Sequence, residues 1–357
     1  MSDLQMSLFH VFTNDFTLYE AYDCPRNKTM EIFERPVLGI YFFVMGMILI
    51  SLYIPCFVVM IKSKSRTPAF QTMLVLAIFD MLSLSVNSVI TGVFDVFGLS
   101  FCHHPLFIFC AGAVGLGSWM GGCVACILLA IDRCVEINTK FRLGFLFYKR
   151  NFRFVMLILI IYWVYSCGFT KPLLFTAEYS SWFFDPKVGK DPSLYHNIAH
   201  TINNLLVSAA TTSLYTYLCI FLVCKNGYTS SMWMCRNKKQ IILQAVVLCT
   251  FHAAAAYIYV YMQFFYSPPV LIVLGQVAWQ WSNGCFCVVY LTLNRTIRNA
   301  VLKMLLSKEF REMLGWHVGV DERFQQAANA VLGTEGSGSR KSNLPLNSVA
   351  VAHSGVW

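Results

Sequence analysis

Long apolar runs separated by short polar stretches dominate the chain. Seven of these runs reach the roughly 20 residues that an α-helix needs to cross the hydrocarbon core of a bilayer. The fifth run has the weakest pattern, because Asn203 and Asn204 interrupt it. The pattern predicts an all-α bundle of seven transmembrane helices, at residues 37–61, 69–94, 105–131, 152–175, 198–224, 240–266 and 269–293.

The composition places the chain among membrane proteins. Hydrophobic residues make up 57% of the chain and charged residues 13%, and the mean hydropathy is +0.57. Soluble domains are about 25% charged. The net charge of +9 does not indicate a nucleic-acid partner, because the basic residues gather in particular loops.

The distribution of Lys and Arg among the loops predicts the orientation of the bundle. Basic residues are concentrated after the first, third, fifth and seventh spans, whereas the segment before the first span carries acidic residues. Cytoplasmic loops of multi-pass proteins carry the excess of Lys and Arg. We therefore expect the N-terminus outside the cell and the C-terminus inside.

Three regions flank the predicted bundle of residues 37–293. Residues 1–36 form the expected extracellular segment, in which Asn27 occupies a glycosylation sequon. Residues 294–315 alternate apolar and basic positions at helical spacing, which predicts an amphipathic helix on a membrane surface with anionic lipid headgroups. Residues 316–357 are polar and rich in Gly and Ser, which is typical of a disordered cytoplasmic tail.

Two cysteines lie on the expected outer side. Cys24 precedes the first span and Cys102 precedes the third. A disulfide between them would hold the N-terminal segment over the bundle, and the outer side of the membrane is oxidising. Two unpaired thiols are the alternative.

Asp80 is the only acidic residue deep inside any predicted span. A charged side chain at that depth costs about 2.5–3.5 kcal/mol. Asp80 should therefore face the bundle interior and serve a function. Asn283 lies at the same depth in the seventh span and is the expected partner of Asp80, although packing between helices is its alternative role. Asn87, two turns above Asp80, completes this predicted buried polar cluster.

Asp132 and Arg133 end a third span that contains no other charge. An arginine in this position can pair with its neighbouring carboxylate in one state and bind a partner protein in another, as a switch requires. The alternative is that both side chains simply extend from the helix end to the interface.

Four short sequences near the ends of spans carry a family resemblance. They are Thr91-Gly92, Phe101-Cys102-His103-His104-Pro105, Ala130-Ile131-Asp132-Arg133-Cys134-Val135-Glu136-Ile137 and Val289-Tyr290-Leu291-Thr292-Leu293-Asn294-Arg295-Thr296-Ile297-Arg298. Over about residues 35–306 the chain resembles rhodopsin-like G-protein-coupled receptors, and most closely the nematode serpentine chemoreceptors of class T. This resemblance implies a small environmental, even volatile, ligand and a heterotrimeric G protein as partner.

The resemblance also implies roles for particular residues. Asp132 and Arg133 match the switch pair of the third helix, and Tyr290 matches the tyrosine at the cytoplasmic end of the seventh. Asp80 matches the aspartate that organises water and a sodium ion, which is the only cofactor that the resemblance implies.

The sequence departs from the family pattern in the first, sixth and seventh helices and in the second outer loop. The first helix has Pro55 and lacks the family's Asn, and the second outer loop has no Cys to bridge to the third helix. The sixth span has Cys249-Thr250-Phe251-His252-Ala253-Ala254 in place of a Cys-Trp-x-Pro motif, and the seventh has Phe286-Cys287-Val288-Val289-Tyr290 in place of Asn-Pro-x-x-Tyr. These departures leave open whether the sodium cluster and the sixth-helix toggle of the wider family operate in this chain.

A ligand pocket is expected between the outer halves of the third, fifth, sixth and seventh helices. The third helix offers no carboxylate there to pair with an amine, which favours a small neutral ligand over a cationic one. Packing is the alternative role for each lining residue. The predicted lining residues are Gly115, Leu116, Trp119, Met120, His200, Asn203, Gln276, Trp279 and Gln280.

These patterns predict a chemosensory receptor without catalytic activity in the plasma membrane, with the sensory cilium of chemosensory neurons as its more specific location. A transporter or channel is the alternative function, with Asp80 and Asn283 lining a path, but no pair of interrupted helices indicates inverted repeats. No bound metal is expected, because the histidines that a membrane metalloenzyme would use fall at different depths. These histidines are His103, His104, His200 and His252.

Overall fold

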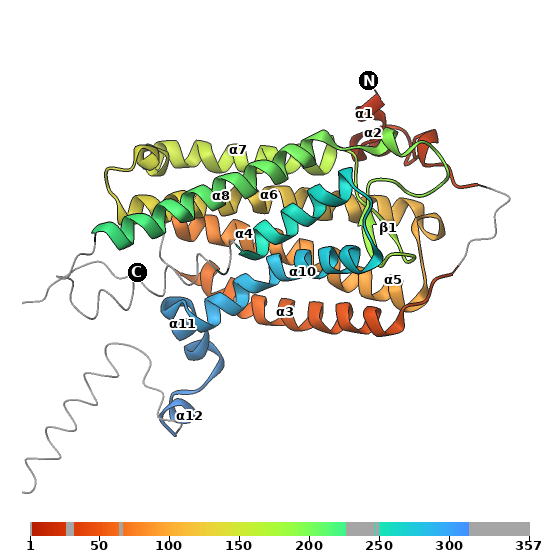
Figure 1. Ribbon diagram of the computed structural model, residues 1–357. Helices are drawn as coiled ribbons and strands as arrows, with labels where there is room; N and C mark the ends of the chain where they lie inside the picture. Colours follow the sequence, from red (N-terminus) through yellow and green to blue (C-terminus); the bar gives the residue numbers. More distant parts are fainter. Residues whose placement is uncertain (1, 26–31, 64–66, 226–246, 248–249, 314–357) are drawn as a thin grey trace, which may run out of the picture. The chain divides into compact units, whose positions relative to one another are not determined.

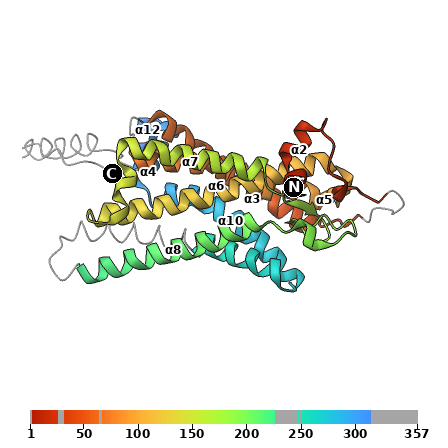
Figure 2. The ribbon, with the colours of Figure 1, turned by 90° about the horizontal axis from the view of Figure 1, so that it is seen from above.

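The computed structural model describes residues 2–25, 32–63, 67–225, 247 and 250–313, most of which are helical (Figures 1 and 2). The chain divides into two units, Met1–Val289 and Tyr290–Trp357. Within the described residues, five helices are long and apolar enough to cross a membrane. They are α3 (Pro36–Lys62), the continuous run of α4 (Pro68–Leu84), η2 (Ser85–Ile90) and α5 (Thr91–Phe97), α6 (Pro105–Ile137), α7 (Lys149–Gly168) and α8 (Ile198–Lys225).

Two further helical segments complete the bundle. Residues 250–264 are helical, and α10 spans Pro269–Thr292. Residues 240–246 and 248–249 of the predicted sixth span lie outside the described residues. Every predicted span thus contains a helix, and the all-α fold class is confirmed.

The ends of two predicted spans are wrong. The third helix continues to Ile137, six residues beyond the predicted end, and the fourth ends at Gly168 rather than at residue 175. Pro172 cannot donate a helical hydrogen bond, which favours a break here. The apolar residues that follow form a strand, so they are buried by protein rather than by lipid.

Helix α6 is the central helix of the bundle (Figures 1 and 2). In its most apolar window, 83% of the residues are buried inside the protein, against 28% in α3 and 22% in α7. The apolar surfaces of α3 and α7 therefore face outward, as the lipid-facing helices of a membrane protein must.

One end of the bundle is covered by irregular segments, and we call it the capped end. It includes a two-stranded antiparallel sheet in which Phe175 of β1 is opposite Trp182 of β2. The Trp182 side chain is fully buried, and its indole N–H donates to Thr91 Oγ1 at 2.8 Å. The segments of the capped end are α1 (Ser2–Gln5), α2 (Leu8–Thr13), η1 (Glu20–Tyr22), η3 (Phe101–His103), β1 (Leu174–Thr176), β2 (Ser181–Phe183) and η5 (Pro192–Tyr195).

The N-terminal segment is part of this cap. A disulfide joins Cys24 to Cys102 with a Cα–Cα distance of 5.8 Å. The Tyr22 ring is buried, with its centroid 5.1 Å from that of Phe109 in α6. Covalent and apolar contacts therefore both hold this segment on the bundle.

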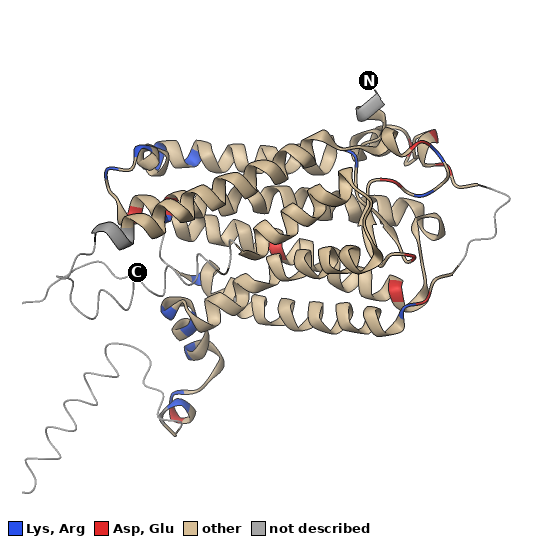
Figure 3. Ribbon diagram, in the orientation of Figure 1, with Lys and Arg blue, Asp and Glu red and all other residues tan. Residues whose placement is uncertain are grey.

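Most charged residues lie near the two ends of the bundle, and few lie along its length (Figure 3). Lys140, Arg142, Lys149 and Arg150 lie in and beside η4 (Arg142–Phe147), at the end opposite the cap, which we call the Arg133 end. Asp80 is fully buried, but it is not the only buried acid, because Asp95 of α5 is also fully buried. The predicted span ended one residue before Asp95, which is why it was missed.

The second unit begins at Tyr290, and its part up to Met313, which the structure describes, includes two short helices. An amphipathic helix is present where it was predicted, but its predicted bounds of 294–315 are wrong, because α11 (Arg295–Leu305) and α12 (Lys308–Met313) are separate helices. Asn294 Oδ1 caps α11 by accepting from the Ile297 N–H at 3.1 Å. Ser307 Oγ accepts from the Phe310 N–H at 3.3 Å and starts α12. Asn27 and residues 314–357 lie outside the described residues.

The contact between α6 and the hairpin depends on Gly112. A Cβ at this position would lie 1.6 Å from the Leu173 carbonyl oxygen, just before β1. We predict that Gly112→Ala lowers the free energy of unfolding by about 1–3 kcal/mol, as overpacking does. Thermal denaturation of the detergent-solubilised protein measures the change.

Gly122→Ala is the matched control on the same helix. A Cβ there would meet its nearest neighbour at 3.7 Å, an ordinary contact with Leu76. Its melting temperature should stay close to that of the wild type. Equal melting temperatures for both variants would contradict the close approach at Gly112.

Candidate functional site

A cavity of about 300 Å³ opens at the capped end. Its walls come from the β1–β2 hairpin, the segment that leads to α8, the start of α8, the helix of residues 250–264 and the start of α10. Most of the lining is aromatic. The lining residues are Leu173, Tyr179, Trp182, Phe183, Phe184, Asp185, Lys187, Pro192, Tyr195, His196, His200, Tyr259, Met262, Gln263, Phe265, Tyr266, Ser267 and Ile272.

Three polar side chains of this cavity, Asp185, Lys187 and Tyr195, are paired within the protein. Lys187 Nζ lies 3.4 Å from Asp185 Oδ2, which neutralises the only acidic side chain of the lining. Tyr195 donates to the Ala21 carbonyl oxygen at 2.5 Å. Burial raises the pKa of Tyr195 to about 12, so its hydroxyl stays protonated and able to donate at neutral pH.

The floor of the cavity leads into a buried chain of hydrogen bonds. His200 of α8 lines the cavity and is 3% exposed. Its Nε2 lies 3.1 Å from Asn204 Nδ2, and Asn204 Oδ1 accepts from the Trp119 indole N–H at 2.9 Å. Asn203 joins the chain, since it donates to Asn204 Oδ1 at 3.2 Å and accepts from the Tyr162 hydroxyl at 3.1 Å.

The chain continues toward the middle of α6 by ring stacking. The Trp119 and His252 rings are stacked at 5.5 Å with an angle of 9° between their planes. His252 Nε2 lies 3.4 Å from Cys126 Sγ. His252 of the sixth span therefore contacts two side chains of the third helix, Trp119 and Cys126.

Of the nine predicted ligand-lining residues, only His200 lines this cavity. Leu116, Met120 and Trp279 belong to the packed core, and Asn203 is buried in the chain below the floor. Much of the lining comes instead from residues 179–196, which include β2 and the segment that leads to α8. The pattern of apolar spans did not predict where this segment lies.

The two predicted glutamines bond to an irregular part of the second helix. Residues 85–90 adopt π-helical geometry, in which the i→i−4 bonding of an α-helix is interrupted. Gln276 Nε2 donates to the Asn87 carbonyl oxygen at 2.8 Å, and Gln280 Nε2 donates to Ser88 Oγ at 3.0 Å. Gln276 Oε1 accepts from the Tyr259 hydroxyl at 3.2 Å, so a wall of the cavity is tied to the π segment.

Asp80 has a different partner from the one predicted. The Tyr53 hydroxyl of α3 donates to Asp80 Oδ2, whereas Oδ1 has no hydrogen-bond partner within the described residues. Asn283 Nδ2 donates instead to the Trp279 carbonyl oxygen at 2.8 Å, four residues back on its own helix. Asn87 Nδ2 also donates to this oxygen, at 3.5 Å. The two asparagines therefore share an acceptor without bonding to Asp80.

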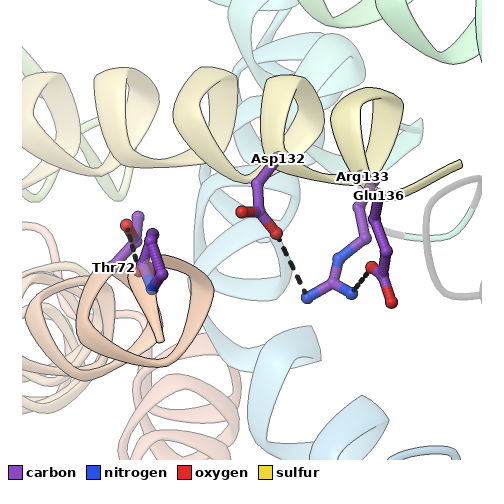
Figure 4. Close-up of polar contacts among 5 residues, drawn as sticks. Thr72, Asp132, Arg133 and Glu136 are labelled. Carbon is purple, nitrogen blue, oxygen red and sulfur yellow. Dashed lines mark hydrogen bonds and ion pairs between the residues drawn. The ribbon is translucent and has the colours of Figure 1, made fainter. Parts of the chain in front are cut away.

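The predicted ion pair is present at the Arg133 end, with a second carboxylate beside it (Figure 4). Arg133 Nη2 lies 3.8 Å from Asp132 Oδ2, and Arg133 Nη1 donates to Glu136 Oε2. The Arg133 side chain is 25% exposed. Glu136 was not predicted, although its spacing of three residues places it on the same face of a helix. Thr72 of the neighbouring α4 donates to the Pro68 carbonyl oxygen at 3.0 Å.

Helices α6 and α8 are joined just beyond this ion pair. Asn138 Nδ2 donates to the Tyr217 hydroxyl at 2.8 Å, and Cys134 Sγ lies 3.6 Å from the Leu214 carbonyl oxygen. These contacts hold the Arg133 end of α6 against α8. Tyr290 lies on α10, where the second unit begins.

Apolar helices, a cavity under a cap and an ion-paired arginine at the opposite end define a multi-pass membrane receptor. The family described as the serpentine type 7TM GPCR chemoreceptor Srt matches residues 6–314, and the chain belongs to this family. The resemblance predicted from the sequence is thereby confirmed, as is the multi-pass membrane location.

A curated relative supports the same assignment. The chain is similar to serpentine receptor class T-55 of Caenorhabditis elegans, with 24% identity over 299 residues that cover 80% of each chain. This class is one of receptors and not one of enzymes.

The Tyr53–Asp80 contact generates a prediction about stability. A hydrogen bond to a charged group contributes about 1.5–3 kcal/mol, and a buried acceptor that loses its donor is costly. Tyr53→Phe should therefore lower the free energy of unfolding by about this amount. In an Asp80→Asn background the same substitution should cost clearly less.

The double-mutant cycle is its own control. Denaturation of the wild type, the two single variants and the double variant gives the coupling energy. Strictly additive effects would show that Tyr53 does not act through Asp80.

Proposed function

We propose that this protein is a chemosensory receptor that binds a small neutral molecule at its capped end and activates a heterotrimeric G protein through Arg133. The family is one of chemoreceptors, which supports the class of function. The observation that carries the coupling role is the ion pairing of Arg133 with both Asp132 and Glu136 at a partly exposed helix end.

The cavity supports the choice of ligand. Aromatic side chains dominate its lining, and its only acidic side chain is paired with Lys187. No carboxylate is left to attract an amine. A neutral molecule with an apolar surface would gain about 25 cal/mol for each Å² that it buries against these walls.

The weakness of the Arg133 ion pairs suits a switch. The side chains of Arg133, Asp132 and Glu136 are 25%, 17% and 31% exposed. Ion pairs that water can reach contribute about 0–1 kcal/mol each. A ligand that prefers the released state 100-fold would supply about 2.7 kcal/mol, enough to overcome both pairs.

The orientation follows from the cap. The Cys24–Cys102 disulfide lies at the capped end, and disulfides persist on the oxidising side of a membrane. The cavity would then face the outside and Arg133 the cytosol, in agreement with the basic residues near η4.

A sodium ion beside Asp80 fits the residues present. Asp80 Oδ1 and Ser83 Oγ are buried oxygens without hydrogen-bond partners in the described part of the chain, and they lie one helical turn apart on α4. Hard cations bind oxygen ligands. These two side chains would hold the ion, which would offset the buried negative charge.

Arg133 is tested by substitution in both directions. Arg133→Ala should abolish ligand-stimulated G-protein activation, because the group that would bind the G protein is gone. Glu136→Gln should raise basal activation, because Arg133 keeps only one carboxylate partner. Nucleotide exchange on a panel of G proteins, in membranes that contain equal amounts of each variant, measures both effects.

Arg142→Ala is the control for the first substitution, because Arg142 is a basic residue of the same end without an ion pair in the described residues. It should retain most of the signal. Full coupling by Arg133→Ala at equal surface expression would refute the proposed role.

Sodium binding is tested by thermal stability rather than by signalling. Replacing choline chloride with sodium chloride should raise the melting temperature of the wild type, because a ligand of the folded state stabilises it. The Asp80→Asn variant should show no sodium-dependent rise. A rise of the same size in the variant would place the ion elsewhere.

A further inference from the structure

His200 lines the cavity, and its Nδ1 atom is buried without a hydrogen-bond partner in the described part of the chain. Among the buried side-chain nitrogen and oxygen atoms of the described residues that line the cavity, it alone has no hydrogen-bond partner. The other polar side chains considered above are paired: Asp185 with Lys187, Tyr195 with the Ala21 carbonyl, and Tyr259 with Gln276.

The protonation of the His200 ring follows from its neighbours. The Trp119 indole nitrogen can only donate, so the Asn204 atom 2.9 Å from it must be the oxygen. The Asn204 amide nitrogen, a donor, therefore faces His200 Nε2 at 3.1 Å. Nε2 must accept this hydrogen bond, which excludes a proton on that nitrogen. A neutral imidazole then carries its single proton on Nδ1.

The doubly protonated ring is incompatible with this arrangement. It would place an N–H of His200 against an N–H of Asn204 at 3.1 Å. The aromatic rings of Phe184 and Tyr259 also flank His200, with centroids 5.1 Å and 6.4 Å away. His200 is therefore a neutral hydrogen-bond donor through Nδ1, on the wall of a mainly aromatic cavity.

We propose that the ligand of this cavity is a small neutral molecule with a carbonyl or ether oxygen that accepts a hydrogen bond from His200 Nδ1. A buried donor without an acceptor is costly, and a ligand oxygen removes this cost on binding. The apolar remainder of the ligand packs against the aromatic walls. This inference rests on the proposed role of the cavity as the ligand site.

A hydrogen bond to His200 also places the ligand at the start of the buried chain of hydrogen bonds. His200 Nε2 is bonded to Asn204, and Asn204 to Trp119 of the central helix α6. A ligand that moves the His200 ring must disturb the Asn204 amide, whose orientation is fixed from both sides. A ligand with an acceptor oxygen would thus bond directly to His200, the first residue of the hydrogen-bonded chain that leads through Asn204 to Trp119 of α6.

Pairs of probes that differ only in the oxygen test the proposal. Acetophenone and α-methylstyrene have the same shape, with C=O in one and C=CH₂ in the other; cyclohexanone and methylenecyclohexane form a second pair. Binding to the purified full-length protein in lipid nanodiscs is measured by saturation-transfer NMR. The wild type should bind each ketone about tenfold more tightly than its alkene, a typical effect of one hydrogen bond to a buried donor.

Two variants assign the preference to one nitrogen. His200→Phe keeps an aromatic ring but has no N–H, and it should bind ketone and alkene equally. His196→Phe is the matched control, because His196 lines the same cavity but is exposed. It should retain the preference. Equal binding of a pair by the wild type, a preference that survives in His200→Phe, or no binding of either ketone would overturn the proposal.

The tautomer is checked without any variant. In protein labelled with ¹⁵N-histidine, His200 should show a protonated Nδ1 and an unprotonated Nε2, and acetophenone should shift the Nδ1 proton whereas α-methylstyrene should not. The opposite tautomer would overturn the proposal even if His200→Phe did not fold. None of these measurements involves a G protein, so a failure of coupling with intact ketone selectivity would count against the proposed function alone.

Discussion

Polar groups inside this bundle must find partners among themselves, because a membrane interior offers no water to replace a missing hydrogen bond. Trp119 shows how far this constraint reaches. Its indole N–H can only donate, so it fixes the orientation of the Asn204 amide, and the amide in turn fixes the tautomer of His200. One donor in the central helix, acting through Asn204, thereby determines which chemical group His200 presents at the cavity.

The same constraint explains the irregular second helix. A π segment at residues 85–90 interrupts the regular α-helical bonding, and the Asn87 carbonyl accepts a hydrogen bond from Gln276. Gln276 is also bonded to Tyr259, which lines the cavity. The local departure from α-helical geometry is therefore compensated by α10, and it connects the cavity wall to the second helix. Such segments are frequent at functional sites of helical proteins.

The sequence predicts features that depend on hydrophobic periodicity and on the depth of a residue in the bilayer. It fails where the path of the backbone or the rotamer of a side chain determines a contact. Apolar runs located the helices, and the Asp132–Arg133 pair followed from its place at a span end. Glu136 could have been found by the same helical spacing. The hairpin could not, because the apolar residues of β1 come directly after Pro172 and Leu173 and continue the apolar run of the fourth span. Depth suggested Asn283 as the partner of Asp80, but the Asn283 amide turns back to its own helix and Tyr53 takes that place.

Helix α6 connects the buried chain below the cavity with the Arg133 end. Trp119, Cys126 and Arg133 are spaced by seven residues, so they lie close to one face of the helix, with a drift of about 20° per step. The first two contact His252, and the third holds the ion pairs. Fourteen residues of α-helix span about 21 Å. Since α6 is mostly buried and has no break over this length, the proposed function would have a small rotation or slide at Trp119 carried to Arg133 as a rigid motion. The partly exposed ion pairs at that end are the weakest contacts that such a motion must break.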